Sequence, residues 1–64
     1  MGASLLTLNE VATMLRTPPA TLRFWRHEGT GPRSFKIGRR VMYREADVTA
    51  WLDQQYARDP RPAS

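Results

Sequence analysis

The chemistry that this sequence offers is mainly that of arginine. Eight of its ten basic residues but only one of its six acids fall in residues 16–44, so this segment carries +7 and the remainder −3. The eight are Arg16, Arg23, Arg26, Arg33, Lys36, Arg39, Arg40 and Arg44. A guanidinium is always charged, and its planar fork binds phosphates and base edges through paired hydrogen bonds. The asymmetry indicates an anionic partner for one face of the protein.

Other kinds of site chemistry lack their residues. The 64 residues include no cysteine, which excludes disulfides and thiolate metal sites, and the single histidine, His27, cannot hold a metal alone. There is no glycine-rich phosphate loop, and no set of nucleophile, histidine and acid. Glu45 and Asp47 stand two apart on a predicted helix and point in different directions. We therefore expect a protein that is not an enzyme and uses no metal or cofactor.

The sequence also lacks the signals of membrane insertion and export. No apolar run approaches the roughly 20 residues of a membrane span. No basic segment followed by an apolar stretch opens the chain, so no secretion signal is predicted. We expect a cytoplasmic protein without membrane contact.

A short amphipathic helix is predicted after a lead-in at residues 1–5. Thr7 and Glu10 have the spacing of a capping box, in which each side chain accepts a hydrogen bond from the other residue's amide. Apolar residues then recur at i, i+3, i+4 and i+7, namely Leu8, Val11, Ala12 and Leu15. This spacing is typical of a helix of about two turns with one buried side.

A second helix is predicted almost directly after the first. Thr17 can cap it, and Pro18 fits the first helical position, where its missing N–H costs nothing. Gly29 suits a left-handed stop. Leu22 and Trp25 are expected to face the core. Two short helices joined by a very tight turn are the signature of a helix-turn-helix.

The apolar residues that follow the next loop recur at every second position, which is typical of strands. A three-residue loop, Gly38–Arg40, would set Ile37 opposite Val41. Phe35 would then lie opposite Tyr43, and all four apolar side chains would share one face. A two-residue loop would put them on two faces and waste apolar area, so we predict the longer loop. Its glycine nevertheless stands first, not at the usual left-handed third position.

The last element is a helix that begins near Glu45. Glu45 and Asp47 in its first turn complement the helix dipole. Val48, Trp51 and Leu52 repeat at helical spacing, and this spacing predicts a core role for both Trp51 and Trp25 rather than stacking on bases.

The predicted order is therefore helix, helix, hairpin, helix. This is a winged helix-turn-helix, mainly α with a small β-hairpin, in a single domain over residues 1–64 with an ordered core of about 5–56 and a flexible tail at 57–64. A hairpin is unstable alone, so its apolar face must pack on the helices while its tip projects Arg39 and Arg40. The second helix then fits the major groove of duplex DNA, and the wing reaches the adjacent backbone or minor groove.

The candidate DNA-binding residues lie on these two elements. They are Thr21, Arg23, Phe24, Arg26 and His27 on the second helix, and Lys36, Arg39 and Arg40 on the wing. Arg23 is expected to contact a base or a phosphate, Thr21 a phosphate or a thymine methyl, and Arg26 the backbone. Phe24 has two interpretations: it packs on DNA, or it fills a gap in the small core. His27 is either a base reader or a solvated residue favoured by the negative helix end.

Four segments resemble the small MerR-like winged helix proteins of the excisionase and AlpA type. They are Leu-Leu-Thr-Leu-Asn-Glu-Val-Ala-Thr-Met-Leu at 5–15, Pro-Ala-Thr-Leu-Arg-Phe-Trp-Arg at 19–26, Phe-Lys-Ile-Gly-Arg-Arg-Val-Met-Tyr at 35–43 and Asp-Val-Thr-Ala-Trp-Leu at 47–52. The likeness covers about residues 5–55. Members often have a serine before the second helix, where this chain has Thr17-Pro18-Pro19, and the loop at residues 30–33 is somewhat long.

The resemblance implies an excisionase, also called a recombination directionality factor, and the arginine-rich composition is similar to that of actinobacterial phages, which suggests a mycobacteriophage. Such proteins bind repeats in attachment-site arms, cooperatively and head to tail, bend the DNA and direct an integrase toward prophage excision. By position, the reading helix would be 18–28 and the wing 35–43. A stand-alone transcription regulator of the same fold and a protein-interaction module remain alternatives.

Overall fold

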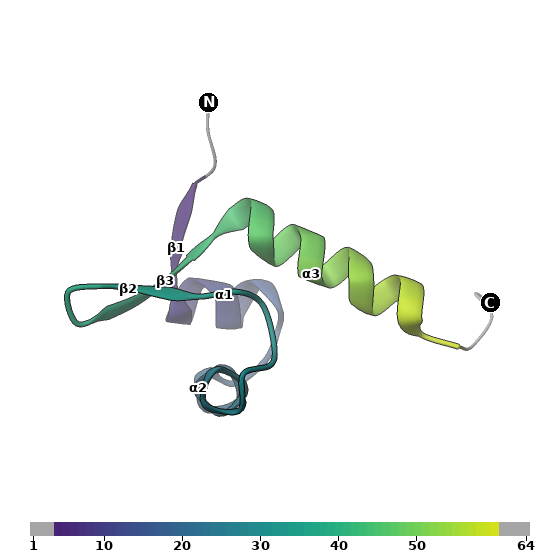
Figure 1. The fold of residues 1–64 in the computed structure, drawn as a ribbon, viewed down its shortest axis with the longest axis horizontal. Helices are drawn as coiled ribbons and strands as arrows, with labels where there is room; N and C mark the ends of the chain where they lie inside the picture. Colours follow the sequence, from purple (N-terminus) through teal and green to yellow (C-terminus); the bar gives the residue numbers. More distant parts are fainter. Residues whose placement is uncertain (1–3, 61–64) are drawn as a thin grey trace.

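The computed structural model describes residues 4–60, and within them the chain forms three helices and one antiparallel sheet (Figure 1). The elements are β1 (Leu5–Thr7), α1 (Leu8–Met14), α2 (Pro19–Glu28), β2 (Phe35–Ile37), β3 (Arg40–Arg44) and α3 (Glu45–Arg58). The predicted mainly α, winged helix-turn-helix architecture is confirmed, with one strand more than expected.

The additional strand is β1, which begins at Leu5, the last residue of the predicted lead-in, and ends at the N-cap Thr7. It pairs antiparallel with β3, with Leu6 opposite Tyr43, so β3 is the centre of a sheet with the order β1-β3-β2. Three residues are too few to show the alternation of polar and apolar side chains that marks a strand in a sequence. The strand ties the start of the chain to the wing.

The start of α1 follows the prediction. The Thr7 amide donates to the Glu10 carboxylate at 2.8 Å, and the Glu10 amide donates to the Thr7 hydroxyl at 3.1 Å, which completes the capping box. Leu8, Val11 and Ala12 are buried. The cap thus fixes the first residue of the helix and, with it, the side that faces the core.

The turn between α1 and α2 places Arg16 in the left-handed conformation, with φ at 55°. The Arg16 amide donates to the Thr13 carbonyl at 3.1 Å, and the Thr17 amide donates to the Ala12 carbonyl at 2.9 Å. These are the two hydrogen bonds of a Schellman motif, which satisfies helix-end carbonyls while it turns the chain. The motif explains how two helices follow each other so closely.

The start of α2 corrects the sequence prediction by one residue. The helix begins at Pro19, and Pro18 is its N-cap, with extended backbone angles of φ −61° and ψ 143°. A residue before proline is disfavoured in the helical region, so Pro19 keeps Pro18 out of the helix. Thr17 does not cap α2, because its hydroxyl donates to the Leu15 carbonyl instead. The predicted left-handed stop is confirmed, with φ at 79° for Gly29.

The hairpin register differs from the prediction. Its loop consists of the two residues Gly38 and Arg39, not of three. The cross-strand pairs are Phe35 with Met42, Lys36 with Val41 and Ile37 with Arg40. Gly38 has φ at 63°, whereas Arg39 lies outside the positive-φ region. A positive φ at the first turn residue alone is typical of a type II′ turn, whose twist matches the flanking strands.

This register sorts the apolar side chains of the hairpin onto two faces, because a shift of one residue moves opposite side chains to the other face. Tyr43 is 1% exposed and Val41 packs against the core. Ile37 is 50% exposed. The predicted pairs of Ile37 with Val41 and of Phe35 with Tyr43 are therefore wrong, since the turn preference of Gly38 outweighs the apolar area left at Ile37.

The core lies where the helices meet the sheet. Its buried residues are Leu8, Val11, Ala12, Leu22, Tyr43 and Val48. Trp25 packs against this cluster, and its ring lies 5.3 Å from that of Trp51 with the planes tilted by 45°. Such a tilted aromatic pair is favourable. Trp25 therefore has the core role that its spacing predicts, whereas Trp51 is half-buried and contacts Trp25, which joins α2 to α3.

The last helix runs away from the sheet (Figure 1). It continues to Arg58, two residues beyond the expected end of the ordered core, and residues 61–64 of the predicted tail lie outside the described residues. Leu52 is 38% exposed and Tyr56 is 81% exposed, so the far half of α3 has little cover. Among residues 4–60, no helix has the length and apolarity that crossing a membrane requires.

Candidate nucleic-acid interface

The outward side of α2 carries the candidate contact residues. Leu22 holds the other side of the helix in the core at 1% exposure. Arg23, Arg26 and His27 are exposed, and Thr21 is half-buried. Phe24 is 60% exposed, which excludes the interpretation that it fills a gap in the core. An aromatic ring held at the surface between basic residues is free to pack against a ligand.

The wing residues Lys36, Arg39 and Arg40 are all exposed. Their placement differs from the prediction in one respect. The shorter loop leaves only Arg39 at the tip, while Arg40 is the first residue of β3 and lies opposite Ile37. Arg40 is therefore set back from the tip, in a strand that is paired with β2.

This placement brings Arg40 close to the second helix. Arg23 and Arg40 line the same shallow groove, together with residues 7–9 and Val41. Neither arginine forms an ion pair with a carboxylate of the described residues, so both guanidinium groups are available to a ligand. The helix and the wing thus form one cationic surface rather than two separate basic patches.

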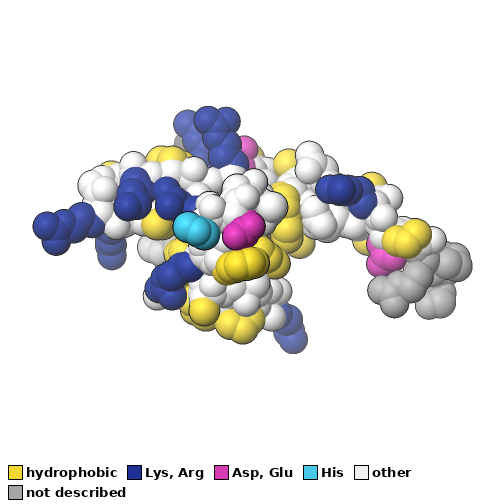
Figure 2. Space-filling model, turned by 60° about the horizontal axis from the view of Figure 1, so that its bottom comes forward, with side chains coloured by type: hydrophobic (Ala, Val, Ile, Leu, Met, Phe, Trp, Pro, Cys, Tyr) yellow, Lys and Arg dark blue, Asp and Glu magenta, His cyan; other side chains and the backbone are white. Residues whose placement is uncertain are grey.

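The distribution of charge over the molecule supports this assignment. Figure 2 views the protein from the side of α2, and its dark-blue Lys and Arg side chains gather toward the hairpin end, with the histidine among them. Acidic side chains are few on this face. A surface of one dominant sign raises the local concentration of a polyanion and speeds its association.

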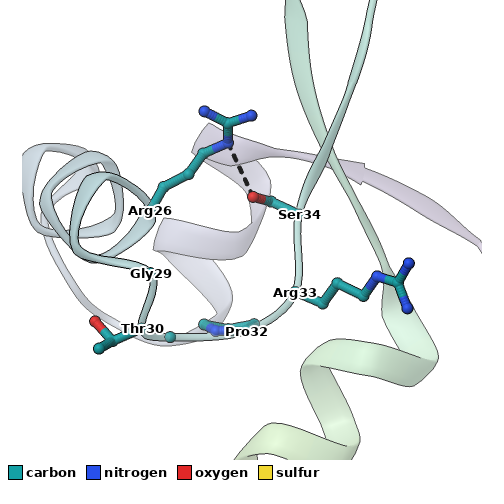
Figure 3. Close-up of a pocket in the computed structure, with 7 residues that line it drawn as sticks. Arg26, Gly29, Thr30, Pro32, Arg33 and Ser34 are labelled. Carbon is teal, nitrogen blue, oxygen red and sulfur yellow. Dashed lines mark hydrogen bonds between the residues drawn. The ribbon is translucent and has the colours of Figure 1, made fainter.

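A hydrogen-bonded group between α2 and β2 adds residues that the sequence did not single out for a binding role. Arg26 Nε donates to Ser34 Oγ at 2.9 Å, across the loop that joins the two elements (Figure 3). Ser34 is also a neighbour of Tyr43 and lowers the pKa of its hydroxyl. The spacing of Arg26 and Ser34 in the sequence does not predict their hydrogen bond, because the contact depends on the path of the intervening loop.

The surroundings of Tyr43 keep its hydroxyl neutral. Burial raises the pKa of Tyr43 above its ordinary value of 10.0, while the nearby Arg26 charge and the hydrogen bond from Ser34 lower it to a smaller extent. Burial disfavours the phenolate because a charge is poorly solvated in the protein interior. The sequence identified Tyr43 only as an apolar residue of the sheet.

The described residues contain no group of three or more His, Cys, Asp or Glu side chains arranged to hold a metal ion. The acids of α3 are instead spread along an exposed helix.

A tight helix-turn-helix, a β-wing beside it and a shared cationic groove define a winged helix-turn-helix protein with a surface suited to double-stranded DNA. The chain belongs to the helix-turn-helix domain family, which matches residues 5–56. The match begins with β1 and includes every element up to α3, of which only the last two residues lie outside it. Comparison with curated proteins and with solved structures found no significant match.

Proposed function

We propose that the protein is an excisionase, which binds and bends double-stranded DNA at attachment-site arms and directs an integrase toward prophage excision without being an enzyme itself. The observation that carries DNA binding is the groove shared by Arg23 and Arg40. The recombination role is supported by the resemblance of residues 36–40 and 47–52 to the excisionase type.

In the proposed complex α2 lies in the major groove. Arg23 and Phe24 are directed at base edges, Thr21 and His27 flank them, and Arg26 contacts the backbone. The wing lies beside the helix, where Lys36, Arg39 and Arg40 meet the neighbouring phosphates or the minor groove. Arginine suits both positions, because its fork pairs with guanine in the major groove and its charge suits the potential of a narrow minor groove.

The implied protein partners are an integrase and further copies of the chain bound head to tail on adjacent repeats. The direction of α3 leaves space for such partners, because the helix leads away from the sheet (Figure 1). Leu52 and Tyr56 on this helix are exposed. Exposed apolar side chains on an otherwise polar helix are suited to protein contacts.

Duplex binding is tested by a salt titration. If about five phosphates are neutralised, log affinity should fall against log salt with a slope of about −4 to −5, because each phosphate contact releases counterions. A fluorescently labelled duplex and anisotropy give both affinity and slope. Failure to bind any duplex at low salt would overturn the proposal and favour a protein-interaction module.

The recombination role is tested in a purified excision reaction. The integrase encoded nearest to this protein is incubated with the product attachment sites, with and without the protein, while a circular-permutation gel reports bending. We expect excision to depend on the protein and the DNA to bend. A protein that binds near the integrase gene, yet leaves excision unchanged and controls a promoter, would instead be a transcription regulator.

A further inference from the structure

The loop between α2 and β2 encloses a shallow pocket beside the end of the reading helix. Arg26 and Ser34 line its two sides, and residues 29–33 form its floor. Figure 3 shows Arg26 and Ser34 pointing toward each other, whereas Arg33 points away from both. Of the two arginines that line this pocket, Arg26 is therefore the one whose side chain points toward Ser34.

The Arg26 side chain is held at one nitrogen and free at the other two. Its Nε donates to Ser34 Oγ at 2.9 Å, and its two terminal nitrogens point away from the loop (Figure 3). A guanidinium has five N–H groups, so four remain on those terminal nitrogens. Within the described part of the chain they meet no carboxylate. This is the arrangement that binds an anion through two parallel hydrogen bonds.

Ser34 in turn lies against the core. Its oxygen accepts from Arg26, and its side chain is a neighbour of Tyr43, which is 1% exposed. Ser34 therefore links the exposed guanidinium to a residue of the core.

We propose that Arg26 forms a site for a backbone phosphodiester, and that Ser34 is a positioning residue that holds its guanidinium ready for that ligand. The inference rests on the proposed function, because the phosphodiester belongs to the bound duplex. An arginine that is mobile in the free protein loses conformational freedom when it binds. The hydrogen bond to Ser34 imposes part of that order beforehand, so less affinity is lost.

The test is a double-mutant cycle on a labelled mixed-sequence duplex at fixed salt. Ser34→Ala should weaken binding about threefold to tenfold, the usual cost of ordering one long side chain. In an Arg26→Ala background, the same change should have no effect, because the group that Ser34 positions is gone. Ser34→Thr keeps the hydroxyl and should bind as the parent does. Equal losses in both backgrounds would overturn the role of Ser34.

Salt dependence provides the second readout. Arg26→Ala should reduce the salt slope by about 0.9, the value for one lost phosphate contact, whereas Ser34→Ala should weaken binding without changing the slope. Circular dichroism checks that each variant is folded. If the parent protein binds no duplex, the proposed function is overturned. If the parent binds and Arg26→Ala equals it in affinity and salt slope, only the phosphodiester site is overturned.

Discussion

Arg23 of α2 and Arg40 of β3 line one groove, although the first belongs to the predicted reading helix and the second to the wing. The relationship depends on the two-residue turn at Gly38 and Arg39, which places Arg40 in the strand instead of at the tip. A duplex whose major groove receives α2 would contact the basic residues of the wing at the same time, so the two contacts should reinforce each other.

Removal of the wing charges should weaken DNA binding on every sequence. In Arg39→Ala/Arg40→Ala, the salt slope should become shallower by about 1.8, since two phosphate contacts would be lost at about 0.9 each. Anisotropy titrations at several salt concentrations measure the slope. Arg58→Ala, at the far end of α3, is a control for loss of charge away from the groove and should have the smaller effect. A double variant that binds as well as the parent would contradict the wing assignment.

Replacement of Arg23 should affect sequence discrimination as well as affinity. Arg23→Ala should cost about 1–3 kcal/mol at the protein's own target, the usual value of a bidentate base contact, and less on a mixed sequence. Arg23→Lys is the matched control, because it keeps the charge and loses the planar fork. We expect Arg23→Lys to retain mixed-sequence affinity and lose preference for the target. Equal losses on both duplexes would instead make Arg23 a phosphate contact.

Two glycines with the same φ of 79° provide a matched test of the packing around Trp25. A side chain at Gly29 would meet nothing within 4 Å, so Gly29→Ala should cost only the strain of a left-handed residue, about 1–2 kcal/mol. At Gly31, a Cβ would lie 3.0 Å from the Cβ of Trp25. Gly31→Ala should therefore lower the free energy of unfolding further, as measured in urea. Equal stability of the two variants would show that Trp25 moves aside at no cost.

Burial of Tyr43 should make the protein sensitive to alkaline conditions. Its pKa is raised by burial, so the folded protein retains a proton that the unfolded chain releases from about pH 10 upward. Stability should therefore be unaffected by this group below pH 10 and should fall as the pH rises above it. Unfolding midpoints at a series of pH values measure the effect. Tyr43→Phe should show a weaker alkaline loss, whereas Tyr56→Phe, at an exposed position, should behave as the parent.

The helices of this fold could be predicted well, because their signals are local. The capping box of Thr7 and Glu10 and the stop at Gly29 each involve residues only a few positions apart. The strand β1 was missed because its partner, β3, lies far along the chain. The predicted hairpin register was wrong because two local preferences conflicted: the turn geometry favoured by Gly38 and the burial of Ile37. The turn geometry outweighed the burial.

The candidate site shows the same division. The residue types of Arg23 and Arg40 were sufficient to mark them as candidates, and the exposure of Phe24 excludes the interpretation that it fills a gap in the core. The position of Ser34 beside Arg26 and Tyr43 had no sequence signal. Ser34 is a common loop residue, and Tyr43 fits an apolar pattern, so only the folded path of the loop reveals what their hydroxyl groups do.

The left-handed conformation of Arg16 places thermal stability and attraction to polyanions in conflict. Glycine adopts φ near 55° without strain, so the Schellman turn would be more relaxed with glycine at this position. Arginine instead adds a positive charge to the most basic stretch of the chain. A lineage selected for thermal endurance alone would be expected to exchange that arginine for glycine, and one selected for retention on nucleic acid would be expected to keep it.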